Sequence, residues 1–175
     1  ELEEAAGALG EAEALLCLSL PLADQDGFEM PEIVEVAGSM RPMFRAAEIG
    51  HPLLEHAVAV RNPVSLGEGA NVLIVTGSNM AGKSTYLKST GLNVVLAGTG
   101  GPVCATGFRW TPMDLRSDIN VRDSLDDGKS YFQVEVERVR KVIEAARESP
   151  FLLAVFDELF RGTSSEERIA LARAI

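Results

Sequence analysis

One eight-residue stretch has the residue types and spacing of a phosphate-binding loop. Residues 77–84, GSNMAGKS, match the pattern G-x-x-x-x-G-K-[S/T] in full. Backbone N–H groups of such a loop point inward at the positive end of a helix and form a concave anion site. Gly82 lets the backbone approach the phosphates, Lys83 adds a charge for the β- and γ-phosphates, and Ser84 offers its hydroxyl to Mg²⁺. The alternative, a chance match in a turn, is disfavoured by the flanking strand and helix patterns.

A pair of adjacent carboxylates follows an apolar run further along the chain. Asp157 and Glu158 come directly after FLLAVF, residues 151–156. An aspartate at the tip of a buried strand can hold Mg²⁺, and a neighbouring glutamate can orient or deprotonate an attacking water. The alternative for Asp157 is a helix cap or a loop charge. The adjacent pair favours ATPases over GTPases or kinases, and the sequence has no guanine-reading NKxD pattern.

The stretch DSLDDGKSYF, residues 123–132, has several interpretations. A calcium loop is disfavoured because Leu125 and Val134 stand where a calcium loop has oxygen ligands. A solvated acidic turn remains open, as does Ser130 serving only as a helix N-cap. In the functional interpretation, the turn from Gly128 to Ser130 forms a second anion site. Two such sites, one from each of two subunits, would sandwich one ATP.

The hydrophobic pattern predicts the elements that position these residues. It indicates a helix over residues 1–20 that Pro21 stops, and a second helix that starts after Gly82 and ends at 98–102. It indicates a third helix over residues 131–148. Apolar runs at 71–76 and 151–156 are typical of strands buried on both faces. Between the first helix and residue 71 we expect a strand at 31–38, a loop with one short helical turn at 41–54, a strand broken at Asn62-Pro63 and a turn at 67–69. Beyond the second helix we expect short strands and loops over 103–128 and a last helix that begins near Ser164 or Ser165.

The helical spacing also predicts which faces are buried, and the order of elements predicts the fold class. The predicted inner face of the helix after Gly82 is Leu87, Thr90, Gly91, Val94, Val95 and Gly98, and that of the later helix is Phe132, Val136, Val139, Ile143 and Ala146. Two buried strands joined by a helical crossover imply an α/β fold with a parallel sheet.

Composition excludes several functional classes. With 175 residues the chain can build one core of ordinary size, and its net charge of −10 makes it a poor DNA-binding surface by itself. Cys17 and Cys104 are far apart, which disfavours a disulfide framework or zinc and suits a reducing, cytoplasmic compartment. His51 and His56 lack metal-ligand spacing, so we expect turn and packing roles and no metal cluster. We also expect no membrane segment and no signal peptide.

Three motifs together resemble the ATPase domain of the MutS family, a branch of the ABC-type ATPases. They are TGSNMAGKSTYLKSTG, DSLDDGKSYFQVEVERV and FDELFRGTSS. GHP at 50–52 and NPVSL at 62–66 extend the similarity, which covers Gly50 to the end, and Asn79-Met80 within the loop is a specific sign of it. The resemblance implies a P-loop NTPase fold of ABC type, with a mainly parallel sheet flanked by helices, an antiparallel strand portion and a leading helix.

The resemblance also implies roles for individual residues. Asn79 would help bind the γ-phosphate, Asp157 and Ser84 would hold Mg²⁺, and Glu158 would be the catalytic base. Gly128 and Ser130 match the signature turn that reaches the partner subunit's ATP, and RGTSS from Arg161 matches a loop at the dimer interface. The implied catalytic residues are Glu158, Lys83 and Ser130, and the implied nucleotide-binding residues are Gly77, Ser78, Asn79, Met80, Ala81, Gly82, Lys83, Ser84, Thr85 and Gly128.

The expected organisation follows from the same resemblance. Residues 1–22 would end a helical lever region, and 23–175 would form the ATPase domain, cut before its switch histidine. We therefore expect a fragment of a longer protein that hydrolyses ATP weakly by itself. The longer protein would be a homodimer that clamps on DNA through domains absent from this chain.

Departures from the family pattern point to a side branch. The usual mismatch-repair motifs resemble GPNMGGKST, DEIGRGTS and STF, whereas this chain has GSNMAGKST, DELFRGTSS and SYF. No aromatic stands near Ala59 and Val60, where the family stacks one on adenine. The alternatives are a related ATPase that serves recombination control or another role, and a nucleotide-binding switch with little hydrolysis.

Overall fold

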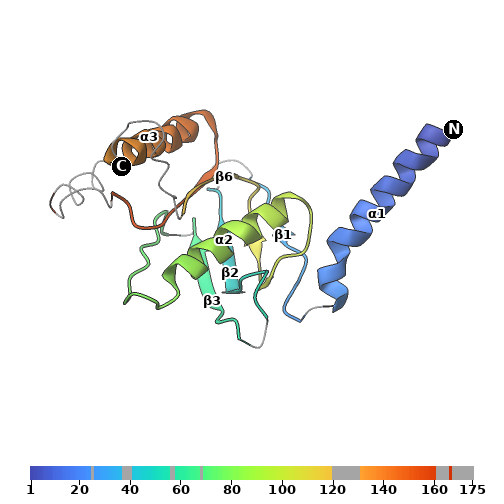
Figure 1. The fold of residues 1–175 in the computed structure, drawn as a ribbon, viewed down its shortest axis with the longest axis horizontal. Coiled ribbons are helices and arrows are strands. Elements are labelled where there is room, and N and C mark those ends of the chain that lie inside the picture. Colours follow the sequence, from blue (N-terminus) through green and yellow to red (C-terminus); the bar gives the residue numbers. More distant parts are fainter. Residues whose placement is uncertain are drawn as a thin grey trace. The chain divides into compact units, whose positions relative to one another are not determined.

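The computed structural model describes residues 1–24, 26–36, 41–55, 58–67, 69–119, 131–160 and 166 (Figure 1). These residues form two compact units, Glu1–Pro112 and Met113–Ile175. We call them the first and second unit and describe each by itself.

The chain opens with the predicted helix, α1, which spans Leu2–Asp24. The prediction that Pro21 stops it was wrong, because Pro21 lies inside the helix. Proline fixes a helical φ and removes only one N–H donor, so three more residues keep the helical conformation beyond it. Its leucines are exposed except for half-buried Leu18, with Leu2 at 89%, Leu9 at 71% and Leu16 at 63%.

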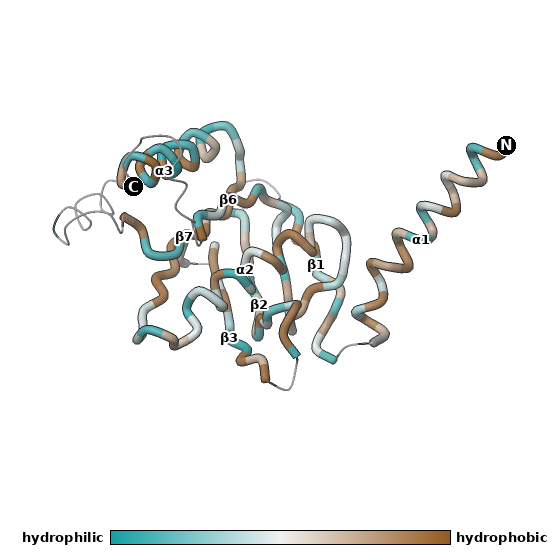
Figure 2. The backbone as a smooth tube through the Cα atoms, in the orientation of Figure 1, coloured by the Kyte–Doolittle hydropathy of each residue, from teal (hydrophilic) through white to brown (hydrophobic). Residues whose placement is uncertain are grey.

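By length and composition alone, α1 is apolar enough over Leu2–Ala23 to cross a membrane. This differs from the sequence expectation that no run of apolar residues in the chain is long enough to span a membrane. Core helices of soluble proteins and N-terminal signal sequences meet the same criterion, so the finding is weak evidence. Figure 2 shows the apolar residues along the helix.

The first unit contains a five-stranded mixed sheet. Its strands are β1 (Glu32–Ile33), β2 (Phe44–Ile49), β3 (Asn62–Leu66), β4 (Ala105–Thr106) and β5 (Arg109–Trp110). Their order is β1-β5-β2-β3, with β4 also paired to β2. β2 is antiparallel to β3, β4 and β5, and only β1 and β5 run parallel. The expected mainly parallel sheet is therefore wrong for this unit.

Three strands of this sheet differ from the sequence expectations. β2 was predicted as loop, but Phe44, Ala46 and Ile49 are each only 1% exposed and form its buried side. The prolines and glycine that suggested a loop flank the strand and do not interrupt it. β3 starts at the predicted break, Asn62-Pro63, because an edge strand tolerates a proline without an N–H donor. Of the predicted strand at 31–38, the structure describes residues 31–36, and within them Glu32–Ile33 form β1, followed by a hydrogen bond from the Val34 N–H to the Trp110 carbonyl.

The predicted buried strand at 71–76 is not a strand in the structure. These residues pair with no described strand, and Val72 and Ile74 are 74% and 79% exposed. Apolar, β-branched composition favours an extended chain, but a strand also needs a neighbour for its N–H and C=O groups. The prediction of a buried strand at 71–76 was therefore wrong in both pairing and burial.

Helix α2, Lys83–Gly98, follows the glycine-rich loop as predicted and lies against β2 (Figure 1). It ends at Thr99 and Gly100, whose positive φ of 77° suits glycine, and the N–H of Gly101 donates to the Leu96 carbonyl at 3.1 Å. Its predicted inner face is partly right. The buried residues are Ser89, Thr90, Gly91, Asn93, Val94 and Ala97, whereas Val95 and Gly98 are exposed.

Asn93 is a buried amide that fastens α2 to the sheet. Its Nδ2 donates to the carbonyls of Gly50 and Ser89, both at 2.8 Å, and its Oδ1 accepts from the N–H of Cys104 at 2.6 Å. Asn93 is fully buried at 0% exposure. The amide therefore satisfies one backbone group after β2 and another before β4, which an apolar residue cannot do.

Replacing Asn93 by alanine is expected to lower the free energy of unfolding by about 2–4 kcal/mol, because two buried backbone groups lose their partner. Val95→Ala, two residues on and 49% exposed, is the matched control and should change it by less than about 0.5 kcal/mol. Urea unfolding followed by the fluorescence of buried Trp110 measures both. Equal effects of the two variants would contradict this role of Asn93.

The second unit contains β6 (Asp114–Asp118), α3 (Tyr131–Glu148) and β7 (Leu152–Phe156). β6 and β7 are parallel, in register from Asp114 opposite Leu152 to Asp118 opposite Phe156. α3 and β7 were predicted within one residue, and the parallel pair has a helix between its strands, as expected. β7 alternates between buried and half-buried residues and is not buried on both faces.

The inner face of α3 was predicted only in part. Val139 is buried, but Val136 is 38% exposed and Ala146 is exposed. Glu135, which a hydrophobic pattern assigns to solvent, is buried. Figure 2 shows hydrophilic and hydrophobic residues on different sides of this helix. The described residues as a whole form a mixed α/β structure.

Candidate functional site

The glycine-rich loop connects residues 71–76 to α2. The N–H of Ala81 donates to the Ser78 carbonyl at 3.3 Å, which closes a turn within the loop. Met80 and Gly82 have positive φ of 68° and 86°. A Cβ built on Gly82 meets nothing within 4 Å, so glycine is required there for its backbone conformation and not for space.

Lys83 turns its side chain back over this loop. Its Nζ donates to the carbonyls of Gly77 and Ser78, at 2.8 and 2.7 Å. These two bonds hold the ammonium group beside the backbone of the loop. A fixed positive charge is thus placed at the start of a helix, where anions are also favoured by the helix dipole.

The first turn of α2 supplies further donors. The N–H of Tyr86 donates to the Gly82 carbonyl at 2.9 Å, so the N–H groups of residues 83–85 precede the first helical bond. Gly82 provides no side-chain cap for them in the described structure. The N–H groups of this first turn, the helix dipole and the Lys83 ammonium together form an anion site suited to phosphate groups.

Tyr86 fixes this end of α2 to the neighbouring sheet edge. Its hydroxyl donates to the Pro63 carbonyl, at the start of β3, at 2.8 Å. Burial raises the pKa of the Tyr86 phenol above its usual range, so the hydroxyl keeps the proton that it donates. The hydrogen bond positions the helix start relative to the first residues of β3.

Asp157 lies directly after β7 in the second unit. Its N–H donates to the Asp118 carbonyl at 3.0 Å, which extends the β6–β7 pairing by one residue. Its Oδ2 atom is buried and has no hydrogen-bond partner among the described residues. A buried carboxylate oxygen without a donor is costly, and a cation or its bound water would satisfy it. The residue therefore fits the role of a magnesium ligand.

The turn after Asp157 has a strained backbone. Glu158 and Phe160 have positive φ of 55° and 58°. Each such residue other than glycine costs about 1–3 kcal/mol, which the surrounding structure must offset. Phe160 is 2% exposed, and its ring centroid lies 6.5 Å from that of Phe132 in α3.

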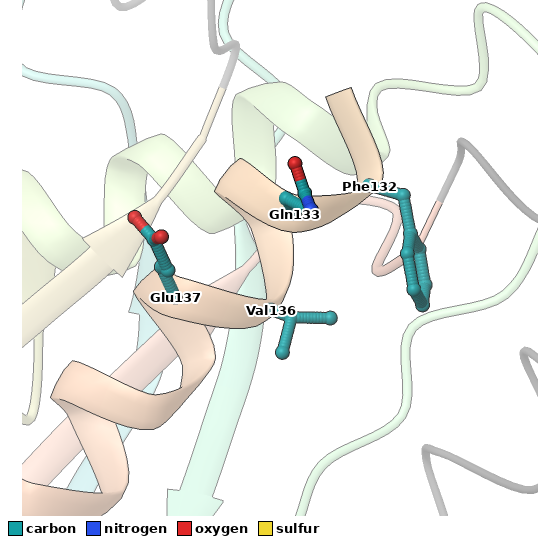
Figure 3. A pocket seen from close by; sticks show the side chains of 4 residues that line it. All are labelled: Phe132, Gln133, Val136 and Glu137. Atoms are coloured by element: carbon teal, nitrogen blue, oxygen red, sulfur yellow. The ribbon is translucent and has the colours of Figure 1, made fainter. Parts of the chain in front are cut away.

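The first turns of α3 border a pocket of about 280 Å³, lined by Phe132, Gln133, Val136 and Glu137 (Figure 3). Figure 3 shows Phe132 and Val136 projecting from one side of the helix and Gln133 and Glu137 from the other. None of the residues predicted to bind nucleotide lines this pocket. We assign no ligand to it.

The model of MutS domain V matches residues 73–175, more than half of the chain. The chain belongs to the MutS family. Domain V is the ATPase domain of that family, and MutS-family proteins bind DNA and dimerise. The match contains the glycine-rich loop and the Asp157-Glu158 turn, and it begins at Leu73, so the similarity noted for residues 50–72 lies outside it.

The predicted site residues of this MutS-family chain fall into three groups. One loop and helix start bring together Gly77, Ser78, Asn79, Met80, Ala81, Gly82, Lys83, Ser84 and Thr85. Asp157 and Glu158 share the turn after β7. Gly128, Ser130 and Arg161 lie outside the described residues, as does the predicted cap at Ser164 or Ser165.

Some positioning residues were missed by sequence reasoning. Tyr86, Asp118 and Phe160 act through hydrogen bonds or ring contacts with residues distant in the sequence, and no local pattern indicates them. Asn93 carries a weak signal, because a lone amide stands between Thr90 and Val94 on the predicted inner face.

Arg61 and Cys104 form a contact that the sequence did not indicate. The Arg61 guanidinium donates to the Gly27 carbonyl at 3.1 Å and to the Cys104 sulfur at 3.3 Å. Burial raises the pKa of the Cys104 thiol, and the nearby Arg61 charge and hydrogen bond oppose this only in part. Cys104 is thus a protonated thiol in the core, and both cysteines are free.

Proposed function

We propose that this MutS-family domain binds ATP with Mg²⁺ and hydrolyses it to ADP and phosphate. The observation that best supports this proposal is the position of Lys83. Its ammonium group donates hydrogen bonds to the glycine-rich loop at the start of α2, where no side chain caps the helix in the described structure. This arrangement concentrates positive charge and N–H donors where the β- and γ-phosphates would bind. Asn79, within the loop, would contact the γ-phosphate.

The residues for Mg²⁺ would be Ser84, through its hydroxyl, and Asp157, through the buried carboxylate. Bound there, Mg²⁺ would neutralise negative charge on the β- and γ-phosphates during transfer. The buried, unpartnered Oδ2 of Asp157 supports this assignment.

Glu158 is proposed as the general base. Its carboxylate would accept a proton from the attacking water as the water oxygen bonds to the γ-phosphorus. The bond between the γ-phosphorus and the bridging oxygen breaks, and ADP leaves with that electron pair. Lys83 would stabilise the charge that develops on the phosphate oxygens.

We propose further that the domain is of ABC type, with residues 1–22 ending a lever region and 23–175 forming the ATPase domain. Two subunits would close around ATP and clamp on DNA through other parts of the protein. The residues DELF, where the usual mismatch-repair motif has DEIG, support a side branch of the family, and control of recombination is the alternative role.

Gly128 and Ser130 are proposed to contact the ATP bound by the partner subunit. Ser130→Ala should then leave nucleotide affinity of the monomer within about twofold and lower hydrolysis by the dimer about 10-fold or more. Fluorescent-nucleotide titration at low protein concentration and phosphate release at high concentration measure the two. Weaker binding by the monomer would refute the assignment to the partner's site.

Titration with a fluorescent ATP analogue tests the proposed function most directly. Lys83→Ala must weaken binding, whereas a variant elsewhere on α2 must not. If both bind as well as the unchanged protein, the loop is not the nucleotide site.

A further inference from the structure

The turn that carries Glu158 is held in a conformation that its residues do not prefer. Glu158 and Phe160, with φ of 55° and 58°, flank Leu159. Side chains with a Cβ seldom adopt left-handed backbone conformations, so contacts outside the turn must hold these residues in place.

The upstream end of the turn is fixed by the sheet. The N–H of Asp157 donates to the Asp118 carbonyl at 3.0 Å, next to the register pair of Asp118 with Phe156. The Asp118 carboxylate accepts from Nη1 of Arg138 in α3 at 3.2 Å. The last residue of β6 thus connects Asp157 to α3.

The downstream end of the turn is fixed by an aromatic contact. The Phe160 ring is buried, and it meets the ring of Phe132 at a centroid distance of 6.5 Å and an interplanar angle of 53°. Phe132 is the second residue of α3 and projects from its first turn (Figure 3). Since buried Val139 and the Arg138–Asp118 pair hold α3, Phe132 offers a fixed surface to Phe160.

We propose that Phe132 and Phe160 are positioning residues that set the orientation of the Glu158 carboxylate. The inference rests on the proposed role of Glu158 as the base. The ring contact fixes the downstream end of the turn, so its loss is expected to let Glu158 relax toward an ordinary backbone conformation. Because the phosphates bind to the loop in the first unit, the loss affects the rate of hydrolysis and not nucleotide affinity.

The test measures steady-state ATP hydrolysis by the full-length protein. Phe160→Gly removes the ring yet accepts a φ near 58° without strain, so its effect reports the lost contact. We expect Phe160→Gly and Phe132→Ala each to lower kcat about 10-fold and to change KM less than about twofold. Phe132→Leu, which keeps an apolar contact, should retain kcat within about threefold.

The decisive comparison repeats both substitutions in a Glu158→Gln protein. If the two rings act through Glu158, Phe160→Gly and Phe132→Ala should each lower the residual turnover of the Glu158→Gln protein by less than about twofold. An equal fall in both backgrounds would overturn the proposal, as would unchanged kcat in the single variants. If Phe160→Gly fails to fold, half-buried Phe132→Ala gives the same comparison. The turnover of Glu158→Gln alone is measured first. If it equals that of the wild-type protein, Glu158 is not the base.

Discussion

Lys83→Ala is expected to weaken ATP binding by about 100-fold, which corresponds to ~2.7 kcal/mol. The ammonium is hydrogen-bonded to the Gly77 and Ser78 carbonyls inside the loop, so it is already where the β- and γ-phosphates would bind. Alanine removes the charge and leaves only the backbone donors and the helix dipole. Titration of the protein with a fluorescent ATP analogue, at constant ionic strength, measures the change.

Lys88→Ala is the matched control, because it removes the same charge from the same helix one turn beyond the loop. Its affinity should stay within about twofold of the unchanged protein. If both variants lose affinity equally, the nonspecific attraction of the nucleotide to positive charge, and not the loop, accounts for binding. If neither loses affinity, the nucleotide binds elsewhere.

Glu158→Gln is expected to keep ATP affinity within about threefold and to lower turnover by about 100-fold or more. Glutamine keeps the size of the side chain and its hydrogen-bonding capacity, but it cannot take the proton of an attacking water. Phosphate release at saturating ATP, with titration of the same preparation, separates hydrolysis from binding.

Glu148→Gln provides the control for this change. It makes the same acid-to-amide substitution at an exposed residue that ends α3 in the second unit. Turnover should stay within about twofold, as for most exposed substitutions far from a site. Unchanged turnover in Glu158→Gln would remove this residue as the base, while a joint loss of binding and turnover would indicate a structural role.

The sequence predicts local elements well where periodicity and end signals agree. The range of α3 was confirmed because its apolar residues recur at helical spacing, and the end of α2 because glycines follow it. β2 was missed because its few apolar residues stand between prolines and a glycine, and short alternation there is a weak signal. Pro21 misled the prediction for α1, since its cost is limited to one hydrogen bond and local crowding.

Pairing and burial depend on contacts between distant residues, and these were predicted less well. Residues 71–76 have a strand composition, but no local feature specifies a neighbour. The glycine-rich loop could be predicted because all the residues of its motif are consecutive in the sequence. Phe160 and Asn93 matter through partners far away in the sequence, at Phe132, Gly50 and Cys104.

The two attachments of α2 limit how this helix can move within the first unit. Tyr86 is bonded to the Pro63 carbonyl and Asn93 to the Gly50 carbonyl, so the helix is held at points about 10 Å apart along its axis. A rod held at two points can neither slide nor rotate without breaking one of them. The helix start that we propose as the phosphate site is therefore held against the sheet of the first unit, and we expect any nucleotide-driven motion to involve the segments that approach it.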